Sequence, residues 1–136
     1  MKRGMLATIA AMALLFAVRL SLAEDAKKEP EKITTTGVLT CQHCGKGFMK
    51  KDDPEKAAAG HSKSCATSGS CAKSGYAVIH GNSWWQFDSD SNKLAKDYLS
   101  KKESTLKVTV VGTPNADKTL HVTSINPATQ EKTKKG

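Results

Sequence analysis

The chain has 136 residues and a formal net charge of +8, because 21 lysines and arginines stand against 13 aspartates and glutamates. This length fits one small domain and leaves little room for a two-domain enzyme with a large buried active site. The sequence contains neither a Gly-x-Ser-x-Gly nucleophile motif nor a glycine-rich phosphate loop. We therefore expect a protein that is not an enzyme.

The first 23 residues are predicted to form a secretory signal peptide. A positive start at Lys2 and Arg3 precedes an apolar run over residues 5–18, and small residues end the segment at Ala23. The apolar run is shorter than the ~20 residues that a membrane span needs. We expect export to the periplasm or the extracellular space, with no membrane span in the mature chain.

The chain that follows the signal peptide (residues 1–23) is predicted to contain one domain flanked by two polar segments. A charged, flexible lead covers residues 24–32, the domain covers 33–127, and a basic tail over 128–136 is expected to be disordered. The domain opens with many β-branched residues, which predict a strand over residues 33–40. Gly37 within that strand suggests a bend or a bulge.

Residues 41–75 form a cysteine-rich insert that differs from the rest of the chain. It holds all four cysteines and only two large apolar side chains. Such a segment buries too little apolar surface to offset its ordering entropy, so it needs cross-links or a metal ion. A short helix over 53–60 is predicted inside it, with Asp53 as the N-cap and Gly60 as a left-handed stop.

The second half of the domain contains the remaining predicted strands and one longer helix. A β-hairpin over 76–87 turns at Gly81-Asn82, and a helix with one apolar face follows the capping residues 88–91. Two strands over 106–110 and 119–125 complete the domain, separated by a turn over residues 112–118. The order strand, insert, strand, strand, helix, strand, strand predicts a mainly β protein, a small five-stranded OB-like barrel. A single sheet with one packed helix is the alternative.

The insert carries a pattern of cysteine and histidine that is typical of a metal site. A C-x2-C pair and an H-x3-C pair supply the four ligands that a tetrahedral zinc ion needs. The predicted ligands are Cys41, Cys44, His61 and Cys65, with Cys71 as a substitute that would complete an all-thiolate set. His43, inside the first pair, is a further candidate.

Two other interpretations of the same cysteines stay open. An exported protein with an even cysteine count commonly forms disulfides, here in one of three pairings, each contributing ~2–4 kcal/mol. A redox-active C-x2-C motif is the third interpretation. It is usually found at a helix N-terminus in a thioredoxin-like βαβ unit, whereas a strand precedes it here.

The aromatic hairpin suggests a different kind of site. Trp84 and Trp85 are neighbours in one predicted strand, so their rings point to opposite faces. One is expected in the core, and the other could bind an oligosaccharide, a polyanion or a protein partner. Export argues against nucleic acid as the partner. His80 and His121 are predicted to be structural residues of strands.

The chain resembles small exported bacterial OB-fold-like domains over about residues 33–125. The matching pieces are Thr-Gly-Val-Leu-Thr-Cys over 36–41, Gly-His-Ser-Lys-Ser-Cys over 60–65, Cys71, Gly75 and Lys-Val-Thr-Val-Val-Gly over 107–112. The resemblance implies an OB-like fold and an exported location, and it implies little about activity.

These observations together predict an exported, non-enzymatic protein whose cysteine–histidine cluster binds a thiophilic metal such as zinc. Its partner would be the metal ion itself or a component of the cell envelope. The alternative is a disulfide-stapled OB-fold module that binds through the tryptophan strand.

Overall fold

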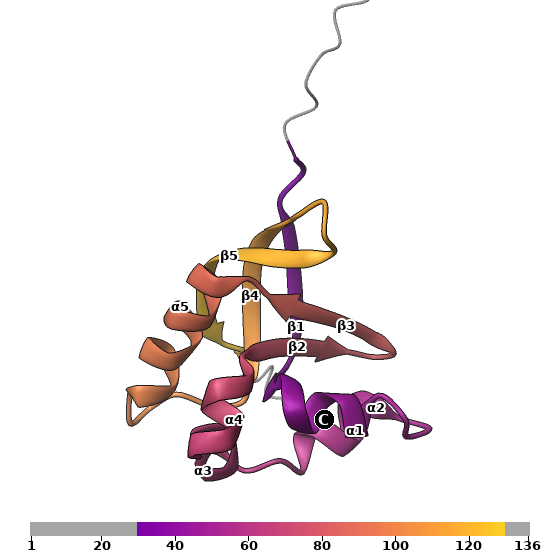
Figure 1. Ribbon diagram of the computed structural model, residues 1–136, viewed down its shortest axis with the longest axis vertical. Coiled ribbons are helices and arrows are strands. Elements are labelled where there is room, and N and C mark those ends of the chain that lie inside the picture. The colour runs from indigo at the N-terminus through magenta and orange to yellow at the C-terminus, as the bar shows by residue number, and fades with distance from the viewer. Residues whose placement is uncertain (1–29, 130–136) are drawn as a thin grey trace, which may run out of the picture.

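The computed structural model of the chain describes residues 30–129. The predicted signal peptide lies outside the described residues, as do most of the predicted lead and tail. Figure 1 shows the described elements, which are β1 (Ile33–Cys41), α1 (Gln42–Phe48), α2 (Pro54–Ala59), α3 (Lys63–Ala66), α4 (Gly69–Ser74), β2 (Tyr76–His80), β3 (Ser83–Phe87), α5 (Ser89–Ser100), β4 (Lys107–Pro114) and β5 (Thr119–Pro127). The predicted order of five strands and one longer helix is confirmed.

The five strands form one mixed sheet in which the pairing order β1-β2-β3-β5-β4 closes on itself. β1 pairs antiparallel with both β2 and β4, and the two remaining antiparallel pairs are the hairpins β2–β3 and β4–β5. A short parallel pairing, with Gln86 opposite Thr119 and Phe87 opposite Leu120, joins the two hairpins. The helices α1 to α4 gather at one end of this sheet (Figure 1).

Gly37 lies where β1 changes its main partner. The first part of β1 pairs with β4 and the last part pairs with β2. A Cβ atom on Gly37 would overlap the backbone carbonyl of Ile79, so two backbones approach each other closely here. Neither pairing of β1 has a register shift at Gly37, where a bend or a bulge was expected. The shift lies between β4 and β5, where Val111 pairs with Ser124 and Gly112 with Val122, so the extra residue belongs to β5.

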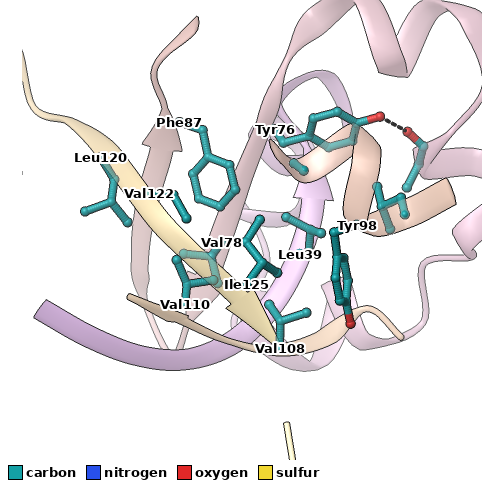
Figure 2. Close-up of a cluster of buried hydrophobic side chains, with 13 residues drawn as sticks. Leu39, Tyr76, Val78, Phe87, Tyr98, Val108, Val110, Leu120, Val122 and Ile125 are labelled. Carbon is teal, nitrogen blue, oxygen red and sulfur yellow. Dashed lines mark hydrogen bonds between the residues drawn. The ribbon is translucent and has the colours of Figure 1, made fainter. Parts of the chain in front are cut away.

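The main core lies between the inner face of the sheet and α5 (Figure 2). It is built almost entirely of aliphatic and aromatic side chains, which are Leu39, Ala66, Tyr76, Val78, Phe87, Ala95, Tyr98, Leu99, Val108, Val110, Leu120, Val122 and Ile125. Tyr76 extends this core toward the insert, because its hydroxyl donates to the Ala66 carbonyl of α3 at 3.2 Å.

A second, smaller cluster connects the insert to the outer face of β1 and β2. Its buried members are Val38, Ala58 and Ile79, and the partly buried side chains against it are Phe48, Met49, Trp84 and Leu106. Phe48 and Met49 are the two large apolar residues of the insert, so the insert uses both to pack on the sheet. Trp84 joins this cluster while Trp85 packs against the main core, as expected for neighbours in a strand.

The helix predicted over 53–60 is present as α2, with one difference at its end. Asp53 caps it as expected, since its Oδ1 accepts from the Lys56 backbone N–H at 3.0 Å. Gly60 has a φ of −79° and is therefore right-handed, not left-handed. The chain leaves the helix through a turn in which the His61 N–H donates to the Ala58 carbonyl at 2.9 Å, so no left-handed residue is needed.

Three helices of the insert, α1, α3 and α4, were not predicted. Each has fewer than eight residues, which is too short for an apolar periodicity to be recognised. Side-chain caps start two of them: Cys41 Sγ accepts from the Cys44 N–H at 3.4 Å, and Ser62 Oγ accepts from the Cys65 N–H at 3.1 Å. β4 is also longer than predicted, so the expected turn over 112–118 is reduced to residues 115–118.

Asp88 joins the start of α5 to the β4–β5 hairpin. Its Oδ1 accepts from the Ser91 N–H at 2.9 Å, and its Oδ2 accepts from Asn115 Nδ2 at 3.2 Å and lies 2.8 Å from His121 Nδ1. Burial would raise the pKa of Asp88, but the hydrogen bonds from Ser91, His121 and Asn115 outweigh it and hold the pKa well below its ordinary value.

Asp88→Ala is expected to lower the free energy of unfolding by about 2 kcal/mol at neutral pH, because it removes this cap. Since the folded-state pKa is depressed, the ionised carboxylate contributes fully above the ordinary pKa of 3.8. Its contribution is lost as the pH falls from there through the folded-state pKa. Urea denaturation from pH 7 to pH 3 measures this difference, which should shrink in acid. Asp90→Ala, in the exposed 3.4 Å pair with Lys93, is the control; an equal loss there would contradict the assignment.

Candidate metal centre

Four cysteines and one histidine converge from separate short elements of the insert. Cys41 ends β1 and caps α1, Cys44 lies in the first turn of α1, His61 lies between α2 and α3, and Cys65 and Cys71 lie in α3 and α4. The helices α1, α3 and α4, the end of β1 and the connection after α2 therefore each bring one donor atom to the same region. Cys41 and Cys71 are far apart in the sequence, and the fold of the insert brings them close together in space.

The donor atoms form two groups of three that share Cys44. Cys41, Cys44 and Cys71 make up one group, and Cys44, His61 and Cys65 make up the other. Within each group all donor atoms lie within 4.8 Å of one another. Cys44 Sγ and Cys71 Sγ are 3.8 Å apart, the separation expected of two thiolates that share one tetrahedral ion with bonds of about 2.3 Å.

The two groups differ in exposure. Cys41 and Cys71 are buried, with exposed fractions of 0% and 3%, whereas Cys44, His61 and Cys65 are half-buried. All four cysteines are free thiols in the structure. The first group therefore lies inside the protein, and the second lies at its surface, where an ion could enter.

The His61 imidazole has no hydrogen-bond partner among the described residues. Both of its ring nitrogens are buried. Burial lowers the pKa of His61, which favours the neutral form that binds metal ions. The ring packs edge-on against Phe48, with centroids 5.5 Å apart and an interplanar angle of 68°. A buried polar ring without partners is costly, and a metal ion would satisfy one nitrogen.

The thiols of the first group differ in acidity because burial and the neighbouring sulfurs act on them differently. Burial raises the pKa of Cys41 and of Cys44 above the ordinary thiol value, and the Cys71 thiol adds to both effects. The hydrogen bond from Cys41 lowers the pKa of Cys71, so Cys71 is the thiol of this group that ionises first. This gives the buried group one favoured thiolate for the first metal–sulfur bond.

The end of the insert is held to the core by hydrogen bonds around Gly75. The Gly75 carbonyl accepts from the Gln42 N–H at 2.9 Å, and Asn92 Oδ1 accepts from the Tyr76 N–H at 2.7 Å. Gly75 has a φ of +84°, and a Cβ atom there would meet the side chains of Asn92 and Gln42 at 2.9 Å. These contacts place α1 and α4 side by side, and with them Cys44 and Cys71.

The structure changes the role of one predicted ligand and leaves three histidines apart. Cys71, predicted as a substitute, belongs to a group as fully as Cys41 and Cys44 do. His43 is exposed and belongs to neither group. His80 lies 3.7 Å from Glu55, and His121 contacts Asp88, so neither approaches the cysteines.

Sequence reasoning missed the residues that position the donors. Asn92 and Gln42 act on a backbone segment far along the chain, and no local pattern marks such contacts. The C-x2-C motif follows a strand, as expected, but it also begins a helix, α1, that was not predicted. Trp84 and Trp85 lie on opposite faces of β3, as predicted, and each is half-buried against one of the two apolar clusters. A binding role for this strand stays a prediction.

Comparison with known proteins found no matching family model, no matching curated protein and no matching solved structure. Within residues 30–129, no helix has the length and hydrophobicity required to cross a membrane.

Proposed function

We propose that this chain is an exported, non-enzymatic protein that binds a thiophilic metal ion, of which zinc is an example, through its cysteine–histidine cluster. The observation that carries the proposal is the convergence of five donor atoms, one of them on an imidazole whose buried nitrogens have no other partner among the described residues. Thiolate and imidazole are the ligands that zinc and other soft ions select.

The fold supports the presentation of such a site by an OB-type barrel. The closed pairing order β1-β2-β3-β5-β4, with α5 between β3 and β4, agrees with a five-stranded Greek-key barrel of that kind. The cluster then lies in the long connection between β1 and β2, at one end of the barrel. A rigid barrel with a variable connection is a common way to carry a binding site.

Protein purified from the envelope of an expressing bacterium is expected to contain bound metal and four thiols that react only after a chelator is added. Metal binding requires deprotonated thiolates, so the bound thiols should be shielded from a thiol reagent. Elemental analysis, thiol titration with and without chelator, and the intact mass measure this together. The intact mass also reports whether the chain lacks its first 23 residues, as export requires.

The disulfide-stapled binding module gives a different result in each assay. It contains no metal, shows no reactive thiols under either condition, and has an intact mass lower by two hydrogens for each bridge. That result would contradict the proposed metal-binding function.

A further inference from the structure

The arrangement of the donors fits two ions better than one. Four ligands around one zinc ion lie no more than about 3.8 Å from one another, so a preformed zinc site would appear as one close group of four. The described residues instead form two close groups of three, and no group of four. All five donors lie in one region of the protein, but they divide into two groups, each of which could surround its own ion.

Cys44 is the member that both groups share. A thiolate sulfur has more than one lone pair, so it can bond to two soft metal ions at once and bridge them. Cys44 Sγ lies 3.8 Å from Cys71 Sγ, in the group that also contains Cys41. It also lies within 4.8 Å of the donor atoms of His61 and Cys65. Its sulfur is therefore the one donor within reach of both groups, the position that a bridging ligand needs.

We propose that the cluster binds two soft monovalent ions of the Cu(I) class, bridged by the Cys44 thiolate. This inference rests on the proposed metal-binding function and specifies the number and class of its ions. Three thiolates complete the coordination of one Cu(I), and two thiolates with one imidazole complete that of the other. Zinc would require a fourth ligand at each centre.

Burial supports the monovalent class at the inner centre. Cys41 and Cys71 are 0% and 3% exposed, so water has little access as a fourth ligand for a divalent ion there. The outer centre is half-exposed and contains His61, whose two ring nitrogens have no partner within residues 30–129. The outer group is thus the expected entry point, and Cys44 connects it to the inner group.

Titration of the mature protein with Cu(I), under anaerobic reducing conditions and against the competing chelator bathocuproine disulfonate, tests the proposal. We expect two Cu(I) ions per chain, counted by native mass spectrometry. Cys65→Ser removes a ligand of the outer group only and should leave one ion. Cys44→Ser weakens both groups, so in the presence of the chelator both ions should be lost.

His43→Ala is the matched control, because His43 lies inside the C-x2-C motif but in neither group. This variant should keep both ions, and circular dichroism should show that every variant retains its strands. Cys65 and Cys44 are half-buried, so their serine variants are expected to fold.

The possible outcomes separate the inference from the function on which it rests. One Cu(I) ion per wild-type chain would overturn the two-ion arrangement and leave the metal-binding function intact. No bound ion of any kind would overturn both. Displacement of bound Cu(I) by an equimolar amount of zinc would overturn the assignment to the monovalent class.

Discussion

Adding a thiophilic metal ion should raise the free energy of unfolding of this protein, and Cys44→Ser should abolish most of that gain. An ion that binds only the folded state stabilises it by about 2.7 kcal/mol when its free concentration is 100 times the dissociation constant. Cys44 belongs to both donor groups, so its replacement weakens every arrangement of ligands in the cluster. Chemical denaturation with and without buffered metal measures the difference.

The metal-free proteins provide the reference for this experiment. Cys44 is half-buried and serine is close to it in size, so the two metal-free chains should differ by no more than about 1 kcal/mol. His43→Ala should gain as much stability from metal as the wild type does. An equal gain in Cys44→Ser would mean that the stabilising ion binds elsewhere on the chain.

Gly37→Ala should destabilise the fold by about 3 kcal/mol, because among the described glycines Gly37 has the least room for a Cβ atom. The new Cβ atom would overlap the Ile79 carbonyl, which belongs to the backbone of β2 and cannot move aside as a side chain would. Either β1 and β2 separate or the register changes, and both disturb the strand that leads into Cys41. Urea denaturation followed by circular dichroism measures the loss.

Gly47→Ala is the matched control for this substitution. Gly47 lies in α1, and a Cβ atom there would meet no atom within 4 Å. Because alanine favours helix more than glycine does, this variant should be as stable as the wild type or more stable, by up to about 1 kcal/mol. A similar loss at both positions would show that the close approach at Gly37 is not what limits substitution.

Much of the fold could be predicted from local patterns. β-branched residues predicted β1 and alternating apolar residues predicted β4. Gly81-Asn82 predicted the turn between β2 and β3, and the capping residues 88–91 predicted the start of α5. These signals are short in range, because a turn, a cap or an alternating strand depends on residues within a few positions of one another. The predictions of these elements were correct because they needed only such local signals.

The short helices of the insert could not be predicted in the same way. α1 begins at Cys41, whose sulfur accepts the capping hydrogen bond, although cysteine is not among the residues that usually mark a helix start. α3 has only four residues, too few for a recognisable periodicity, and it is joined to the core by the hydrogen bond from the Tyr76 hydroxyl to the Ala66 carbonyl.

The sequence by itself determined which chemistry is available: soft donors at Cys41, Cys44, His61, Cys65 and Cys71, in a segment with too few apolar residues to form a core of its own. Only the tertiary structure decided how these donors are grouped, because the grouping depends on where the insert contacts the sheet and α5. Contacts such as Tyr76 with Asn92 and the approach of Gly37 to Ile79 form between strands and helices that pack together. Tertiary packing brings together residues that are far apart in the chain, and such contacts cannot be predicted from a local sequence pattern.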